Sequence, residues 1–169
     1  AAEHVALGGL DERDGADERV APAQAFEPVQ EALRDGLRDG LHRAVELGVN
    51  WIDCAAIYGH GHAEEVVGRA VQGKRDSLIL ATKCGRVWEP GSVEIGKCLL
   101  RDSIKRELEA SLKRMSVETF DLYQIHWPTK PKNDLEGWAC MAKLKEEGKI
   151  RFAGVSNFDV QQIEALSDV

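Results

Sequence analysis

The segment WIDCAAIYGHGHAEEVVG, residues 51–68, contains side chains whose types and spacing suggest chemistry. Asp53 lies inside an apolar run that is typical of a buried strand, and Tyr58 follows it in a loop bounded by glycine. A lone buried carboxylate is costly, so we expect Asp53 to have a cationic partner. Lys83 is the candidate, because it stands near the end of the next strand-like run, residues 78–84.

These side chains meet only if the runs that carry them are parallel strands. His126 and Asn157 stand at the ends of two further strand-like runs, and side chains alternate between the faces of a strand. Parity assigns four sets to one face: Trp51 with Asp53; Ile79 and Ala81 with Lys83; Leu122 and Gln124 with His126; and Ala153 and Val155 with Asn157. Since parallel strands end at one edge of a sheet, we expect these groups to converge there, with Tyr58 on the loop above.

The expected cluster has a definite chemistry. A lysine ammonium beside a phenol favours the phenolate, and a phenol tuned in this way is a general acid–base group for a carbonyl or alcohol oxygen. In this interpretation Asp53 holds Lys83, Lys83 tunes Tyr58, and His126 donates a hydrogen bond that orients the oxygen. Each residue alone also has an ordinary structural interpretation, so the prediction depends on all four occurring together.

Alternating runs supply the elements that must position these residues. Strand-like runs occupy residues 50–55, 78–84, 120–126 and 152–155, and helix-like runs occupy residues 29–45, 64–71, 101–115, 134–147 and 160–166. With a short candidate strand at residues 5–9 they make about five βα units, which implies parallel strands joined by crossover helices. A doubly wound sheet and a (β/α)₈ barrel both begin in this way, and periodicity does not separate them. Asp102 or Ser103 is the expected N-cap of the third helix.

Composition limits the class of protein. The chain has 169 residues, of which 43% are hydrophobic, and a net charge of -7, so we expect one globular domain that does not bind nucleic acid. It has neither an apolar run of about 20 residues nor the profile of a signal peptide, and its four cysteines form no Cys-x-x-Cys pair. We therefore expect a cytoplasmic protein with no membrane partner. Residues 1–25 are expected to form a short strand and an irregular acidic loop, followed by the main domain at 26–169.

Two short motifs suggest other functions and fail on chemistry. GRAVQGKR, residues 68–75, is close to a phosphate-binding loop, but Arg75 occupies the position of the required Ser or Thr. His60 and His62 with a nearby cysteine suggest zinc, yet their spacing in a glycine-rich loop is more typical of solvated histidines. The sequence therefore predicts no metal site.

Four longer segments resemble the aldo-keto reductase superfamily: GVNWIDCAAIYGHGHAEEVVGRAV, LATKCG, ELEASLKRMSVETFDLYQIHWP and GKIRFAGVSNF. The resemblance extends from about residue 41 to the end of the chain. It implies a (β/α)₈ barrel of the TIM-barrel type, here truncated to about five βα units. It also implies reduction of aldehydes or ketones to alcohols by hydride transfer from NADPH, with a tyrosine as the general acid.

The resemblance also implies three sets of site residues. These are catalytic Asp53, Tyr58, Lys83 and His126; cofactor-binding Ser156, Asn157 and Asp53; and Trp88 and Trp127 in the substrate pocket. By this resemblance Tyr58 delivers the proton to the carbonyl oxygen, and the Ser156–Asn157 pair holds the nicotinamide carboxamide. The preference for NADPH over NADH depends on the resemblance alone.

The chain departs from the family pattern at both ends. The opening β-hairpin of the family is not recognisable, and a (β/α)₈ barrel needs about 250 residues. An open sheet has unpaired edges, so we expect a piece of a longer protein or a chain that self-associates. The alternative to a reductase is an inactive or non-catalytic scaffold of the same family, like the potassium-channel β subunits.

Overall fold

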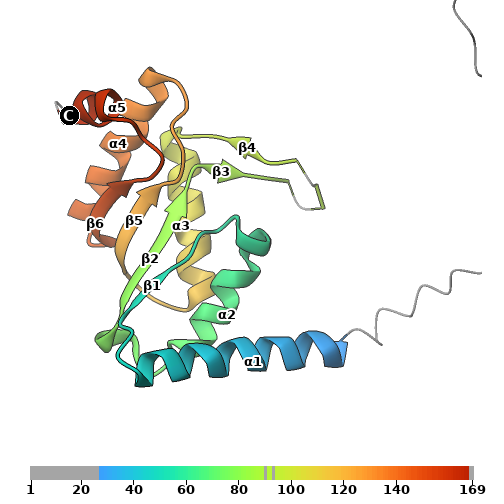
Figure 1. Cartoon of the computed structure of the whole chain (residues 1–169). Helices are drawn as coiled ribbons and strands as arrows, with labels where there is room; N and C mark the ends of the chain where they lie inside the picture. The colour runs from blue at the N-terminus through green and yellow to red at the C-terminus, as the bar shows by residue number, and fades with distance from the viewer. Residues whose placement is uncertain (1–26, 90, 93, 168–169) are drawn as a thin grey trace, which may run out of the picture.

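A parallel sheet forms the centre of the computed structural model, which describes residues 27–89, 91–92 and 94–167. Its strands stand in the order β1-β2-β5-β6, and each pairs with its neighbour in parallel (Figure 1). Their bounds are β1 (Trp51–Asp53), β2 (Ile79–Cys84), β5 (Phe120–Ile125) and β6 (Ile150–Val155). The strand and acidic loop predicted before residue 26 lie outside the described residues.

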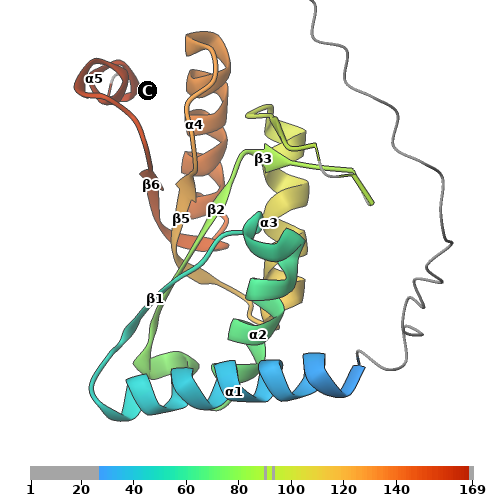
Figure 2. The same ribbon diagram turned by 45° about the vertical axis from the view of Figure 1, so that its right-hand side comes forward.

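The helices lie between and beside the strands. They are α1 (Glu27–Glu46), α2 (His62–Ala70), α3 (Arg101–Met115), α4 (Pro131–Glu146) and α5 (Val160–Leu166), with short 3₁₀ turns η2 (Tyr58–Gly61) and η3 (Arg75–Ser77). Helices α2, α3 and α4 cover one face of the sheet, and α1 crosses below the starting ends of the strands (Figures 1 and 2). Among the described residues no helix covers the opposite face. None of the described helices is long and apolar enough to span a bilayer.

The hydrophobic core lies between the sheet and helices α2 to α4. Leu80 and Tyr123 on the strands are fully buried, as are Leu108 on α3 and Met141 on α4. Helix α2 lies close against the end of α3 because residue 68 is glycine: a Cβ there would stand 2.6 Å from the Cα of Met115. The core therefore fixes the helices on the face of the sheet that does not carry Asp53.

The register of the strands shows which side chains share the other face. Asp53 is aligned with Ala81, Ala81 with Leu122, and Leu122 with Phe152. Phe152 and Gly154 thus lie on the same face as Asp53 and Lys83, whereas Ala153 and Val155 pack against the core. The parity predicted for the last strand was wrong by one residue, because the run 152–155 on which it was based is apolar throughout and does not reveal which face is buried.

Helices α1, α2 and α4 begin two or three residues earlier than their sequence patterns suggested. Helix α3 starts at Arg101 as expected, but the Arg101 N–H donates to Glu136 Oε1 of α4 at 3.1 Å, so a neighbouring helix replaces the predicted side-chain cap. Helix α4 starts at Pro131 instead of Asp134. The Asp134 carboxylate accepts from the backbone N–H and hydroxyl of Thr129 at 2.8 and 2.7 Å, so it holds the loop before the helix.

A second, two-stranded sheet was not predicted. Strands β3 (Arg86–Val87) and β4 (Gly96–Lys97) pair antiparallel and form a hairpin directly after β2. The hairpin projects from the end of the sheet where the parallel strands terminate (Figure 1). It therefore stands beside the edge at which the sequence places its candidate site.

Candidate active site

Lys83 and Asp53 form a direct ion pair at the ends of neighbouring strands. Lys83 Nζ lies 2.6 Å from Asp53 Oδ2 and donates to the carbonyl oxygen of Cys54 at 2.8 Å. The Lys83 side chain is 6% exposed and that of Asp53 46%. A pair with one solvated partner contributes little stability. Its main consequence is that the ammonium of Lys83 has a fixed direction.

Tyr58 and His126 complete the group of four side chains. Lys83 Nζ lies 5.5 Å from the centroid of the Tyr58 ring, and the Tyr58 and His126 rings meet edge to face with their centroids 5.9 Å apart. The structure thus brings together all four residues that the sequence singled out for catalysis. Tyr58 is 44% exposed, so the group lies on an open surface.

His126 is in its neutral form at neutral pH. Burial lowers the pKa of His126 below its ordinary 6.5, the charges of Lys83 and Arg86 lower it further, and Asp53 opposes them. Its Nδ1 atom is buried and has no hydrogen-bond partner among the described residues. A neutral imidazole has one N–H donor and one acceptor. It can therefore donate a hydrogen bond to an oxygen bound beside Tyr58 without carrying charge.

The loop that carries Tyr58 depends on left-handed backbone conformations. Gly59 has φ +60°, His60 +52° and Gly61 +97°. A Cβ at Gly61 would stand 2.8 Å from Cδ of Arg114, so glycine there also permits close approach to α3. The turn brings Tyr58 back over the end of β2.

A buried carboxylate ties this loop to the strand that carries Lys83. Glu64, in the first turn of α2, is fully buried; it accepts from Thr82 Oγ1 and from Arg114 Nε, each at 2.6 Å. Thr82 precedes Lys83, and Glu64 follows the Tyr58 loop. The sequence did not reveal this contact, because nothing in the pair Glu64–Glu65 distinguishes the buried acid from the exposed one.

Ser156 and Asn157 lie at the end of β6, beside His126. Asn157 Nδ2 donates to the carbonyl oxygen of His126 at 2.8 Å and to Ser156 Oγ at 3.0 Å. Asn157 reaches this edge because its backbone turns to φ +62° just after the strand. Both of these hydrogen bonds use its Nδ2, and because the side chain is exposed its amide oxygen can accept another hydrogen bond.

The two predicted pocket tryptophans both contact residues near the site. Trp88, just beyond β3, meets His60 of the Tyr58 loop edge to face, with ring centroids 5.3 Å apart. Trp127 follows His126, and Lys97 Nζ of β4 stands 5.3 Å from the centroid of its ring. Lys97 and His60 were not singled out as pocket residues. The Pro-Gly pair at residues 90–91, typical of a turn, is the sequence signal that could have indicated the hairpin.

A second group of titratable side chains lies on the core face of β2. Burial raises the pKa of Glu107 to about 7, although its carboxylate accepts from the Gly85 N–H at 2.8 Å and from Ser103 Oγ at 3.0 Å. Burial also raises the pKa of Cys84 and of Tyr123 well above their ordinary values. Cys84 and Tyr123 therefore stay protonated at neutral pH, whereas Glu107 titrates in that range, and all three lie on the other face from Lys83. No group of three or more metal-ligating side chains occurs in the part of the chain that the structure describes.

Comparison with known proteins gives consistent matches. A model described as the aldo/keto reductase family matches residues 11–168. The Bacillus subtilis aldo-keto reductase YhdN is 40% identical over 131 residues, 76% of this chain and 39% of that protein. The NADH-specific methylglyoxal reductase of Escherichia coli is 37% identical over 128 residues, 69% of this chain and 39% of that protein. The chain thus spans about two fifths of the length of these relatives.

A solved structure shows the same fold. An aldo/keto reductase from Klebsiella pneumoniae, in complex with NADP and acetate, superposes with a TM-score of 0.67 and 36% sequence identity. The match covers 80% of this chain and 44% of that one. It confirms the predicted fold class, a partial barrel of the TIM-barrel type.

Proposed function

This chain belongs to the aldo/keto reductase family, and on that premise we propose that it reduces an aldehyde or ketone to an alcohol with Tyr58 as the general acid. The observation that supports this most directly is the approach of Tyr58 to both Lys83 and His126 at one edge of the sheet. A phenol between an ammonium and a neutral imidazole is equipped to hand a proton to one oxygen atom.

Each of the four side chains has a separate task in this proposal. Tyr58 gives its hydroxyl proton to the carbonyl oxygen as that oxygen gains negative charge. The Lys83 ammonium, directed by Asp53, stabilises the phenolate that remains on Tyr58. His126 donates one hydrogen bond that orients the oxygen, and its neutral form avoids placing a second cation beside Lys83.

The residues present fit a nicotinamide cofactor at the end of β6. Asn157 uses its Nδ2 within the protein and has an amide oxygen left to accept from a carboxamide; the hydroxyl of Ser156 lies beside it. When bound, the cofactor would supply the hydride that reaches the carbonyl carbon. Ser156, Asn157 and Asp53 are the residues we assign to holding it.

We propose NADPH as the cofactor and a small carbonyl compound as the substrate. The Klebsiella pneumoniae structure contains NADP, whereas one Escherichia coli relative is NADH-specific, so the relatives include both nucleotides. The relative named as a methylglyoxal reductase makes methylglyoxal a suitable first test compound.

Turnover by the purified chain tests the proposal. Methylglyoxal is mixed with NADPH or with NADH, and loss of the reduced nucleotide is followed by absorbance for the wild type and for Tyr58→Phe. We expect faster turnover with NADPH, and a loss of about 10²–10⁴-fold in Tyr58→Phe because the proton donor is gone. Equal rates in the two proteins would contradict the assignment of Tyr58.

A non-catalytic scaffold of the same family is the second candidate, favoured by the 44% exposure of Tyr58, which leaves the four side chains on an open surface. Fluorescence titration with NADPH separates the two candidates. Cofactor binding together with turnover that depends on Tyr58 supports a reductase. Absence of both binding and turnover supports the scaffold.

A further inference from the structure

One face of the β3–β4 hairpin is directed at the candidate active site. Arg86 and Lys97 are partners in the antiparallel register, so they share a face, and Trp88 shares it by alternation. Trp88 meets His60 of the Tyr58 loop, and Lys97 stands over Trp127, next to His126. The two strands therefore present this face to the segments that carry the proposed proton donor and its neighbour.

This face carries positive charge without a matching acid. Within the described residues neither Arg86 nor Lys97 has a carboxylate at ion-pair distance, and the hydrogen bond of Lys97 Nζ is to an uncharged group, the carbonyl oxygen of Pro128, at 3.3 Å. Arg86 is half-buried, and its charge lowers the pKa of His126, so the guanidinium acts on the site itself.

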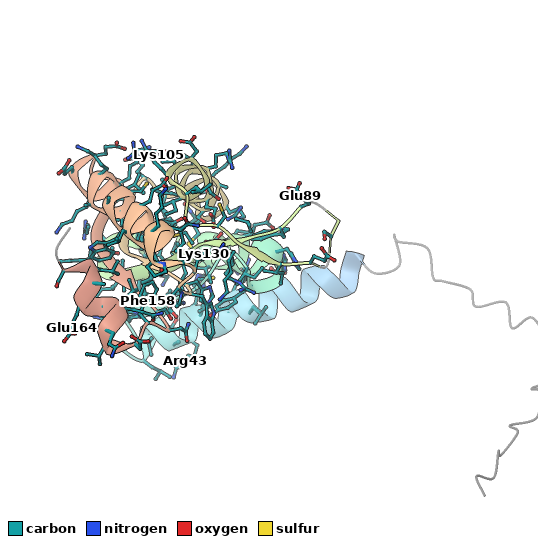
Figure 3. The ribbon with its side chains drawn as sticks, turned by 90° about the horizontal axis from the view of Figure 1, so that it is seen from above. Arg43, Glu89, Lys105, Lys130, Phe158 and Glu164 are labelled. Atoms are coloured by element: carbon teal, nitrogen blue, oxygen red, sulfur yellow. The ribbon has the colours of Figure 1, made fainter. Side chains whose placement is uncertain are left out.

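The nearby acids do not cancel this charge. Glu89 lies toward the outer end of the projecting hairpin, away from the sheet (Figure 3). Glu94 is exposed on the returning segment of the same hairpin, beyond Lys97. Asp53 is already paired with Lys83. A molecule held with its oxygen at Tyr58 therefore meets an excess of cations on the hairpin side.

We propose that the β3–β4 hairpin selects carbonyl compounds that carry a carboxylate, which Arg86 and Lys97 bind while the carbonyl oxygen reaches Tyr58. The inference rests on the proposed function for the carbonyl end, and on the hairpin alone for the anionic end. A carboxylate accepts charge-assisted hydrogen bonds from both side chains, and the flanking Trp88 and Trp127 offer apolar surface to the carbon chain between the two groups.

Binding can be measured without cofactor or turnover. The ¹⁵N-labelled chain is titrated with 4-oxopentanoate and with its methyl ester, which differ in charge and share the ketone. The indole N–H signals of Trp88 and Trp127, assigned from Trp88→Phe and Trp127→Phe, report occupancy. We expect the acid to shift both signals and to bind about tenfold more tightly than the ester, and the difference to shrink with added salt.

Substitutions of Arg86 and Lys97 test whether these two side chains cause the preference for the acid over the ester. Arg86→Gln and Lys97→Gln should each weaken binding of the acid by about fivefold and leave the ester unchanged, while Arg86→Lys should retain most of the preference. Lys145→Gln is the matched control, because Lys145 is an exposed cation on α4. The unchanged spectrum of the remaining residues verifies that each variant is folded.

The inference would be overturned if the chain bound the acid and the ester with equal affinity. It would also be overturned if the preference for the acid persisted in both Arg86→Gln and Lys97→Gln, or if neither compound shifted the two indole signals. A response to inorganic phosphate that exceeds the response to the acid would reassign Arg86 and Lys97 to a phosphate group. Failure of the proposed function appears separately, as absence of methylglyoxal turnover, since methylglyoxal is uncharged and does not need the two cations.

Discussion

His126 is surrounded by groups that disfavour its charged form: the low-dielectric surroundings, Lys83 and Arg86. We predict that its ring titrates below the ordinary 6.5, as followed by the pH dependence of its NMR signals. Since the pKa is depressed on folding, the stability contributed by neutral His126 is present above pH 6.5 and is lost as pH falls through the lowered value.

Arg86→Gln removes one of these causes and serves as the internal control. The His126 midpoint should rise toward 6.5 in this variant and stay unchanged in Lys145→Gln. If the His126 ring of the wild type titrated above pH 6.5, the charge of Asp53 would outweigh burial, Lys83 and Arg86. The account of His126 as a neutral hydrogen-bond donor would then be wrong.

Much of the candidate site could be predicted at the residue scale, because charged side chains are unusual in the apolar runs where several of its residues stand. Asp53 and Lys83 are charged residues at the ends of apolar strands, which the sequence shows directly. The partners of Glu64 and the parity of the last strand could not be predicted, since both depend on how α2, α3 and β6 pack. Asn157 reaches the site through a left-handed turn and not through the parity we assigned to it.

At the scale of elements, Glu107 connects α3 to the start of the β3–β4 hairpin through the Gly85 N–H. Its pKa is raised by burial from 4.5 to about 7, so its stabilising contribution is full below pH 4.5 and is lost as pH rises toward 7. We predict that Glu107→Gln is more stable than the wild type by up to about 3 kcal/mol at about pH 8, with the difference vanishing below about pH 4.

Thermal unfolding at a series of pH values measures this difference. Glu118→Gln is the matched control, because Glu118 is exposed in the turn after α3. A Glu107→Gln protein that loses stability equally at every pH would indicate that the carboxylate matters through its hydrogen bonds and not through its charge.

The contact among α2, α3 and β2 gives a second prediction at this scale. Glu64→Gln removes the charge that holds Arg114 and leaves a largely buried guanidinium without an anion. We expect a loss of about 3 kcal/mol in the free energy of unfolding. Glu65→Gln, one residue away and half exposed, should change it by less than about 0.5 kcal/mol. Similar losses in the two variants, measured by denaturant unfolding, would show that the Glu64–Arg114 pair is not important for stability.

The order and type of the main elements could be predicted, whereas the starting points of α1, α2 and α4 and the β3–β4 hairpin could not. Residues 101–115 and 160–166 were expected as helices and are α3 and α5 with the same bounds, because their apolar spacing is regular. Helix α3 is capped by Glu136 from α4, a contact between elements that no local pattern contains. Strands β3 and β4 are two residues each, too short to leave a periodic signal.

At the scale of the whole molecule, the sheet has one covered and one open face. Phe152 is 64% exposed and Trp51 50% exposed on the open face, and no described strand pairs with the outer edges of β1 and β6. Exposed apolar faces and open edges favour association. We predict a mass that rises with concentration in sedimentation equilibrium, and a shift toward the monomer in Phe152→Lys.

The control for association is Val160→Lys, which changes an exposed apolar residue of α5 away from the sheet. A wild-type chain that stays monomeric at every concentration would contradict the prediction. Equal effects of the two substitutions would assign association to general hydrophobicity and not to the open sheet face. The cytoplasmic location, inferred from the cysteines, stays a prediction.

The central claim is that Tyr58 and Lys83 act as one unit on one oxygen atom. A double-mutant cycle on turnover of methylglyoxal tests it most directly, with Tyr58→Phe, Lys83→Met and the combined variant. If the two residues form a unit, the double variant is no slower than the slower single variant, about 10²–10⁴-fold below the wild type. If the two losses multiply, or if Tyr58→Phe retains wild-type turnover, the residues act independently and the proposed centre is wrong.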